Sequence, residues 1–88
     1  MVEYVITFAR SARSELDNLS ASLVNRILPR IKALARDPRP VGCRKVEGTA
    51  DAWRIRIGDY RVIYQVFDEE QVVDIVAIRH RSQAYKPR

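Results

Sequence analysis

One stretch of the sequence decides the fold, namely Trp53-Arg54-Ile55-Arg56-Ile57-Gly58-Asp59-Tyr60-Arg61-Val62-Ile63-Tyr64. Apolar and polar residues alternate on both sides of Gly58-Asp59, and strict alternation is the period of a half-buried β-strand. A glycine at the first position of a two-residue loop favours a primed hairpin turn. The stretch is therefore predicted to form a β-hairpin with one apolar face. The register pairs Ile57 with Tyr60, Ile55 with Val62, and Trp53 with Tyr64.

Three arginines share the second face of this predicted hairpin. The register places Arg56 directly opposite Arg61, while Arg54 lies opposite Ile63 on the same face. Like charges directly across a β-ladder destabilise it, and a bound phosphate would offset that effect because arginine forks match its oxygens. The alternative is that the arginines only keep this face soluble and cover apolar surface with their stems. We favour an anion site on a solvent-facing surface formed by the three side chains.

The segments before the hairpin predict one strand and two helices. Residues 2–8 alternate loosely and favour a strand, after which Ser11 is the predicted N-cap of a short helix. A second helix, capped by Ser20 or Ser22, presents an apolar stripe at helical spacing. The stripe consists of Leu23, Ile27, Ile31 and Leu34. Pro29 lies inside this helix and predicts a kink, because an interior proline removes a hydrogen bond.

The segments around and after the hairpin predict further strands. Residues 41–47 favour a short strand, residues 68–71 a polar turn, and the apolar run 72–78 a central strand covered on both faces. Residues from about 80–88 are expected to form a basic tail. The chain is therefore expected to be one α+β domain over residues 1–88. In it, two N-terminal helices pack on one face of a mainly antiparallel, four- to five-stranded sheet, in the order β-α-α-β-β-β-β.

The composition indicates a globular domain with a polyanionic partner. The 88 residues carry a net charge of +5, which suits RNA or an acidic protein that masks the same surface. No apolar run approaches the roughly 20 residues of a membrane span, and no signal peptide is evident. The single cysteine, Cys43, is expected to be buried or half-buried and fits a reducing cytoplasm. One histidine and one cysteine do not make a metal-ligand set, so neither a metal nor a cofactor is expected.

Three segments of the chain resemble a known family. They are the hairpin 53–64, the preceding Lys45-Val46-Glu47-Gly48, and the later run Val76-Ala77-Ile78-Arg79-His80-Arg81-Ser82-Gln83-Ala84-Tyr85. Together they resemble the RelE-type toxins of bacterial toxin–antitoxin pairs, within the RelE/ParE superfamily, and the likeness covers nearly the whole chain. The resemblance implies a metal-independent endoribonuclease that cuts mRNA in the ribosomal A site. In such a reaction the RNA's own 2′-hydroxyl attacks the adjacent phosphate.

The resemblance also places a catalytic set on this chain. The family positions fall on Arg54, Arg56, Arg61, Arg79 and Tyr85. Many relatives carry lysine at the two strand positions occupied here by Arg54 and Arg56, so the charge is kept and a proton donor is lost. The arginines would neutralise the dianionic transition state, and Tyr85 would take the 2′-hydroxyl proton. Lys45 and Arg81 are expected to join Arg54 and Arg56 in binding RNA phosphates.

The general acid is left open between two neighbouring residues. Arg79 holds the family position but is a weak proton donor, because the pKa of arginine exceeds 12. His80 is the better acid on pKa grounds, although it also reads as a strand-end residue that is hydrogen-bonded to the backbone. Tyr85 likewise has a purely structural reading, as a tail aromatic packed on the sheet.

A geometric condition applies to Arg79. If the turn at residues 68–71 pairs Phe67 with Val72, simple alternation puts Arg79 on the face away from Arg61. Arg79 joins the arginine face only if the strand contains a bulge, the loop has an odd length, or the chain bends out of the sheet. We therefore predict such an irregularity before Arg79.

The expected partners follow from the resemblance and the charge. They are mRNA and the ribosome, and a cognate acidic antitoxin that wraps the basic face in a hetero-oligomeric complex able to bind operator DNA through the antitoxin. No membrane is expected as a partner. One alternative is a ParE-like inhibitor of DNA gyrase on the same fold, against which the retention of Arg61, Arg79 and Tyr85 argues. The other is a non-enzymatic nucleic-acid-binding module, for which the charge alone would suffice.

Overall fold

The computed structural model describes residues 3–49 and 51–84. Its elements in chain order are β1 (Val5–Phe8), α1 (Arg10–Asp17), α2 (Ala21–Ala33), β2 (Arg44–Lys45), β3 (Ala52–Ile57), β4 (Tyr60–Phe67), β5 (Val72–His80) and α3 (Arg81–Ala84). This order confirms the predicted α+β class with two helices before the main strands.

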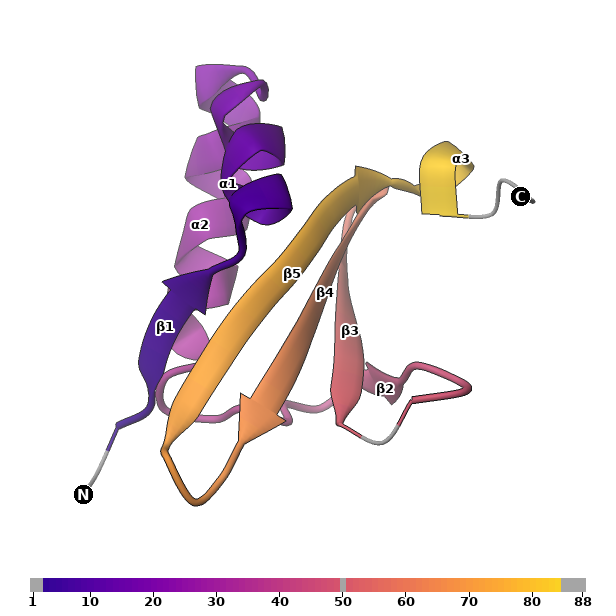
Figure 1. Ribbon diagram of the computed structural model, residues 1–88. Coiled ribbons are helices and arrows are strands. Elements are labelled where there is room, and N and C mark those ends of the chain that lie inside the picture. Colours follow the sequence, from indigo (N-terminus) through magenta and orange to yellow (C-terminus); the bar gives the residue numbers. More distant parts are fainter. Residues whose placement is uncertain (1–2, 50, 85–88) are drawn as a thin grey trace.

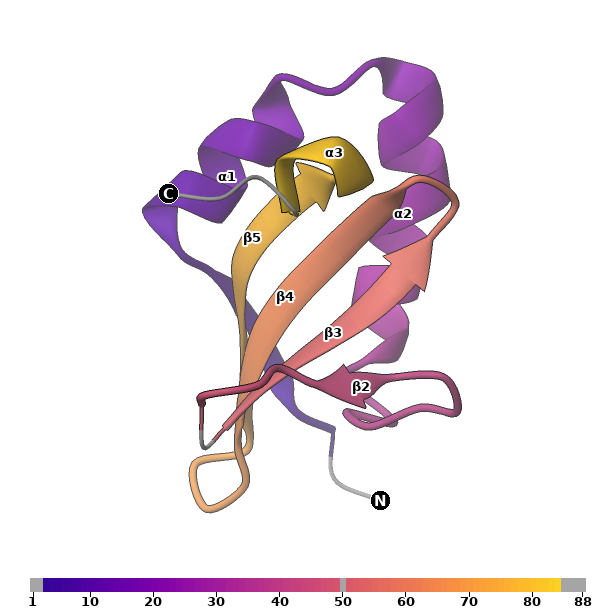
Figure 2. The ribbon, with the colours of Figure 1, turned by 90° about the vertical axis from the view of Figure 1, so that its right-hand side faces the viewer.

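The strands form a single mixed sheet in the order β1-β5-β4-β3-β2. Only β1 runs parallel to its neighbour β5, and the other three pairings are antiparallel. The predicted central strand is confirmed as β5, which lies between β1 and β4. Figure 1 shows α1 and α2 on one side of the sheet. Figure 2 looks at the other side, where α3 stands at the upper end of β5 and β2 lies across the lower end of the sheet.

The hairpin of β3 and β4 has the predicted register at all positions from Trp53↔Tyr64 to Ile57↔Tyr60. Gly58 has a φ of +60°, which the loop requires and which a residue without a Cβ adopts readily. The apolar face of the hairpin packs against α2, as predicted. The buried cluster includes Ile55, Ile57, Val62 and Tyr64 from the hairpin and Ile27, Ile31 and Leu34 from α2 and its C-terminus.

The two helices begin differently from one another. The side chain of Ser20 accepts a hydrogen bond from the backbone N–H of Leu23 at 3.2 Å, which confirms the cap of α2. The prediction of Ser11 as a cap is wrong, because α1 begins at Arg10 and Ala9 occupies the N-cap position without a side-chain bond. Ser11 is the second residue of α1, and its hydroxyl donates to the carbonyl of Val76 in β5 at 3.0 Å. Pro29 lies within the single helix α2.

The strand expected at residues 41–47 is much shorter than predicted. Only Arg44–Lys45 pairs with β3, because the chain turns at Gly42 and again at Gly48, whose φ angles are +94° and +80°. At the start of the expected basic tail, after β5 ends at His80, residues Arg81–Ala84 form the short helix α3. Within residues 3–49 and 51–84, no helix combines the length and the apolar character needed to cross a membrane.

Candidate active site

Arginines from three neighbouring strands form one row across the open face of the sheet. Arg56 of β3 pairs with Arg61 of β4, and Arg61 pairs with Arg79 of β5. Arg54 lies two residues before Arg56 on the same face, and Arg44 of β2 pairs with Arg54. The predicted sharing of one face by Arg54, Arg56 and Arg61 is therefore confirmed.

A bulge in β5 brings Arg79 into this row. Ile63 pairs with Ala77, whereas the next residue, Tyr64, pairs with Ile75, so Val76 is the extra residue. One extra residue reverses the side-chain alternation that follows it. The irregularity predicted before Arg79 is thus confirmed, and it lies three residues before that arginine.

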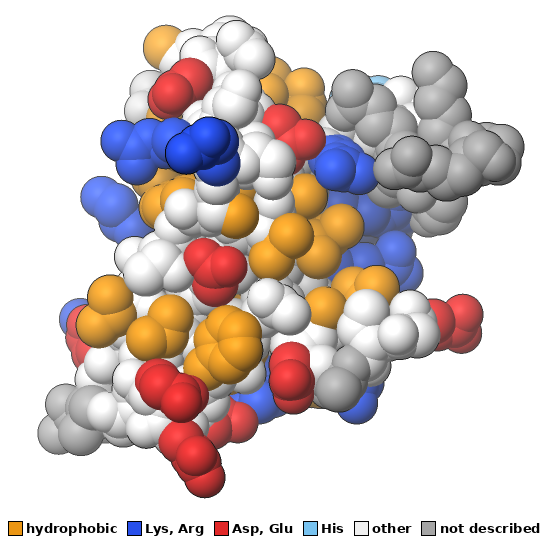
Figure 3. Space-filling model, viewed as in Figure 1, with side chains coloured by type: hydrophobic (Ala, Val, Ile, Leu, Met, Phe, Trp, Pro, Cys, Tyr) orange, Lys and Arg blue, Asp and Glu red, His pale blue; other side chains and the backbone are white. Residues whose placement is uncertain are grey.

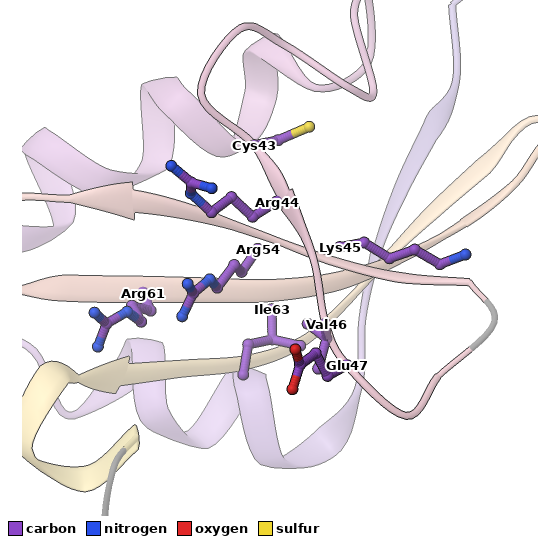
Figure 4. A pocket seen from close by; sticks show the side chains of 8 residues that line it. All are labelled: Cys43, Arg44, Lys45, Val46, Glu47, Arg54, Arg61 and Ile63. Atoms are coloured by element: carbon purple, nitrogen blue, oxygen red, sulfur yellow. The ribbon is translucent and has the colours of Figure 1, made fainter.

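The row borders a cavity on the open face. This cavity has a volume of about 640 Å³ and is lined by Cys43, Arg44, Lys45, Val46, Glu47, Arg54, Arg61 and Ile63. A second hollow of about 240 Å³ shares Arg44, Arg54 and Arg61 and adds Arg56 and Gly42. Figure 4 shows the guanidinium groups of Arg44, Arg54 and Arg61 directed to the same side, whereas Lys45 points away from them. Such a cluster of guanidinium groups suits a chain of phosphates.

Arg61 is buried, which corrects the expectation that it faces solvent. Its residue exposure is only 3%. The residue occupies the middle of the row with Arg56 and Arg79 beside it, and α3 contacts its strand. Local alternation assigned the correct face but carried no information about the burial of the side chain.

Arg79 is held by a carboxylate from α1. Its Nε donates to Glu15 at 3.2 Å, while the other carboxylate oxygen of Glu15 accepts the backbone N–H of Ile78 at 2.8 Å. The side chains of Arg79 and Glu15 are 41% and 30% exposed, so water screens this ion pair only in part. The carboxylate therefore contacts both a backbone group of β5 and one arginine of the row.

His80 lies apart from the arginine row. It pairs with Tyr60 on the opposite face of the sheet, where the two rings meet edge to face with centroids 5.3 Å apart. Its Nδ1 lies 3.0 Å from the hydroxyl of Ser82. His80 and Tyr60 help line a separate cavity of about 220 Å³ together with Arg26 and Asp59. The structure thus does not bring His80 to Arg61.

The two remaining predicted residues lie at or beyond α3. Arg81 is tied to the hairpin turn, because its backbone N–H donates to the carbonyl of Asp59 at 2.7 Å and its side chain forms a 3.9 Å ion pair with the same residue. Tyr85 falls outside the residues that the structure describes.

The loop that leads to Arg44 in β2 is anchored by side chains around it. Arg39 makes a two-pronged ion pair with Asp68 and lies over the ring of Trp53, 5.3 Å from its centroid. The guanidinium of Arg39, together with the hydroxyl of Tyr4, holds the pKa of Asp68 below its ordinary value. The hydroxyl of Tyr64 donates to the carbonyl of Pro38 at 2.8 Å, and burial raises the pKa of Tyr64. These contacts anchor the loop that leads into β2.

Basic side chains lie on more than one side of the molecule. In Figure 3 they gather at the right and again at the upper left, and several acidic side chains lie near the lower end. Within the described ranges 3–49 and 51–84, no group of three or more His, Cys, Asp and Glu residues could hold a metal ion.

Sequence reasoning missed two residues of this site. Arg44 was not singled out, although it precedes Lys45 in the same basic pair and its register partner is Arg54. Glu15 gave no local signal, because its partners Ile78 and Arg79 lie more than 60 residues away in the chain.

Comparison with known proteins places the chain in a family. A family model described as "ParE toxin of type II toxin-antitoxin system, parDE" matches residues 6–85. The mRNA interferase toxin RelE of Escherichia coli K12 is 28% identical over 86 residues, covering 93% of this chain and 90% of the relative. Toxin RelG of Mycobacterium tuberculosis is 29% identical over 84 residues, covering 94% of this chain and 97% of the relative.

Solved structures show the same architecture. The archaeal RelE–RelB complex from Pyrococcus horikoshii superposes with a TM-score of 0.79 at 30% identity, covering 92% of this chain and 98% of that chain. The intact E. coli RelBE toxin–antitoxin complex gives a TM-score of 0.78 at 25% identity, covering 88% and 95%. The helix-backed sheet is therefore shared with these toxins. The chain belongs to the RelE/ParE superfamily of type II toxin–antitoxin toxins.

Proposed function

We propose that this toxin is an endoribonuclease that cleaves mRNA in the ribosomal A site and so inhibits translation. The observation that carries the proposal is the row of Arg56, Arg61 and Arg79 across three strands beside an arginine-lined cavity. Three like charges in a row destabilise a sheet. A bound polyanion would offset this repulsion, and the row would stabilise any further negative charge that the polyanion develops during the reaction.

The proposed reaction uses the RNA's own 2′-hydroxyl as the nucleophile. Attack on the adjacent phosphorus gives a dianionic five-coordinate species, and departure of the 5′ oxygen leaves a cyclic phosphate. Arg61, at the centre of the row, stabilises that charge from a fixed position with few water neighbours, which strengthens its effect. Arg44, Arg54 and Arg56 hold flanking phosphates and thereby fix the register of the strand.

Two protons must move in this reaction. Tyr85 is proposed to take the proton of the 2′-hydroxyl, because it matches the family position for that role. Arg79 neighbours Arg61 and acts by charge, since a guanidinium is a weak acid, so water supplies the proton of the leaving 5′ oxygen. His80 faces the opposite side of the sheet together with Tyr60, and for that reason we give it no proton-transfer role.

The proposed partner is an acidic antitoxin that covers the basic face. The P. horikoshii and E. coli relatives were crystallised in complex with RelB antitoxin. A basic groove binds RNA without regard to sequence, because phosphate contacts supply sequence-independent affinity. A hetero-oligomeric complex that masks the groove would keep the toxin inactive in the cytoplasm, where its substrate is translated.

A second candidate function is inhibition of DNA gyrase. The observation that favours it is the family description itself, which names a ParE toxin over residues 6–85. An inhibitor that acts by binding alone has no need for a buried arginine between two others, and so the arginine row favours the nuclease.

One experiment separates the two functions. The toxin is induced without its antitoxin, and mRNA 5′ ends are mapped while supercoiling by purified gyrase is assayed in parallel. We expect new 5′ ends within translated reading frames and no loss of supercoiling. Loss of supercoiling without new 5′ ends would overturn the nuclease in favour of the gyrase inhibitor.

A further inference from the structure

Glu15 contacts two consecutive residues of β5. One carboxylate oxygen accepts the backbone N–H of Ile78 at 2.8 Å, and the other accepts Nε of Arg79 at 3.2 Å. The contacts join α1 to the end of the strand that supplies the third arginine of the row. Neither the family match nor the resemblance assigns a role to this carboxylate.

The contacts fall where β5 has lost its neighbouring strand. The pairing of β1 with β5 ends at Phe8↔Ile75, and Ala9 adds a last backbone bond to the carbonyl of Ile75 at 2.8 Å. Beyond that point α1 lies beside β5 and replaces the missing strand with side chains. Ser11 donates to the carbonyl of Val76, the bulged residue, and Glu15 accepts from Ile78. Helix α1 therefore satisfies the backbone of the segment that turns Arg79 toward Arg61.

The charge of Glu15 matters as well as its hydrogen bonds. Arg79 lies directly across the ladder from Arg61, and like charges in that relation repel each other. A carboxylate bonded to Nε of Arg79 offsets the repulsion and limits rotation of the guanidinium. With this anchor, Arg79 keeps one orientation beside the buried Arg61.

We propose that Glu15 is a positioning residue that holds Arg79 in the arginine row, an inference that rests on the proposed nuclease function. It acts through Arg79 and does not touch the RNA. Loss of the anchor lowers the rate of cleavage on bound mRNA, because small misplacements of a charge-stabilising group have large effects on rate. Affinity for the mRNA–ribosome complex changes little, since the phosphate contacts of Arg44, Arg54 and Arg56 remain.

The competing explanation is that Glu15 only completes the edge of β5 and therefore affects stability alone. Glu15→Gln separates the two roles. The amide oxygen still accepts the N–H of Ile78, whereas the amide NH₂ is a donor and cannot accept from Nε of Arg79. Glu3→Gln is the matched control, because Glu3 forms a 3.0 Å ion pair with Arg36 that is far more exposed.

The kinetic test uses the purified full chain and ribosomes programmed with a defined mRNA. We expect Glu15→Gln to lower the saturated cleavage rate about tenfold or more, with a half-saturating concentration near that of wild type. In an Arg79→Met background, Glu15→Gln should cause no further loss of rate. Glu3→Gln should match wild type. A Glu15→Gln variant that cleaves at the wild-type rate, or an equal loss in the Arg79→Met background, would overturn the proposal.

A spectroscopic test does not depend on nuclease activity. The side-chain Nε–Hε signal of Arg79 in a ¹H–¹⁵N NMR spectrum is assigned by its disappearance in Arg79→Lys. We expect a sharp signal in wild type that broadens and shifts in Glu15→Gln but stays unchanged in Glu3→Gln. If the wild-type protein fails to cleave mRNA, the proposed nuclease function is refuted. The NMR signal still tests whether Glu15 positions Arg79. An Arg79 signal that is identical in Glu15→Gln and wild type would overturn that role.

Discussion

Replacing Arg61 tests whether the arginine row serves catalysis or only the surface of the protein. Arg61 is 3% exposed and lies between Arg56 and Arg79. A change to alanine therefore removes packing as well as charge, and a loss of activity would be ambiguous. Arg61→Met retains a stem of similar length and removes only the charged head.

The expected magnitudes differ between the two variants. Arg61→Ala removes two buried methylene groups, each worth about 0.8 kcal/mol, so it should lower the free energy of unfolding by about 2 kcal/mol once the cavity term is added. Arg61→Met keeps the packing and relieves the like-charge contacts with Arg56 and Arg79. Its free energy of unfolding should stay within about 1 kcal/mol of wild type. Both variants should lose on the order of 100-fold or more in cleavage rate, because each removes one charge-stabilising group.

The assay combines urea unfolding with cleavage of ribosome-bound mRNA by each purified variant. Arg30→Met is the matched control, since Arg30 is exposed on α2 and away from the open face. We expect Arg61→Met to be folded and inactive, and Arg30→Met to be folded and active. A folded Arg61→Met variant that cleaves at the wild-type rate would refute the catalytic reading of the row.

Three further predictions concern stability and the partner. The guanidinium of Arg39 and the hydroxyl of Tyr4 hold the pKa of Asp68 below its ordinary value. The contact therefore stabilises the fold fully at pH values above the unfolded pKa of about 3.9. This stabilisation is lost as the pH falls through the lower pKa of the folded state. Asp68→Asn should therefore flatten the acid side of the melting temperature plotted against pH, and an unchanged acid side would contradict this. Gly58→Ala should lower the free energy of unfolding by about 1 kcal/mol, measured by urea unfolding, because the φ of +60° disfavours a Cβ. The atoms nearest to the added Cβ belong to the flexible end of Arg26, so they can move aside and add little to this cost. Association with the antitoxin should slow as salt rises, because complementary charge accelerates encounter, and a stopped-flow rate that does not vary with salt would place the contact on an apolar surface.

The register of the hairpin could be predicted because the signals that set it are local. A two-residue loop with glycine first and alternation on both sides determine every pair from Trp53 to Tyr64. The burial of Arg61 could not be predicted in this way, since the exposure of a side chain depends on segments that only the whole fold brings near. Glu15 escaped notice for the same reason, because its partners are distant in the sequence.

The alternation of side chains along a strand determines which of Arg79 and His80 can face the arginine row. Adjacent residues of a strand point to opposite faces, so a bulge that turns Arg79 toward Arg61 also turns His80 away. Arg79 and His80 could therefore both reach the site of Arg61 only if the chain left the sheet before Arg79. The structure continues β5 through His80, and so only Arg79 joins the row.

The arrangement of the fold explains how a sheet can carry a row of arginines without losing its structure. The opposing face packs Ile55, Val62 and Ile78 against the helices, so the core does not depend on the charged face. Repulsion within the row is offset at one end by Glu15, which reaches Arg79 from α1. The middle arginine, Arg61, is buried, with a residue exposure of 3%. The positive charge is therefore held in place before any substrate arrives, and a phosphate chain that enters the cavity meets a site that needs little rearrangement.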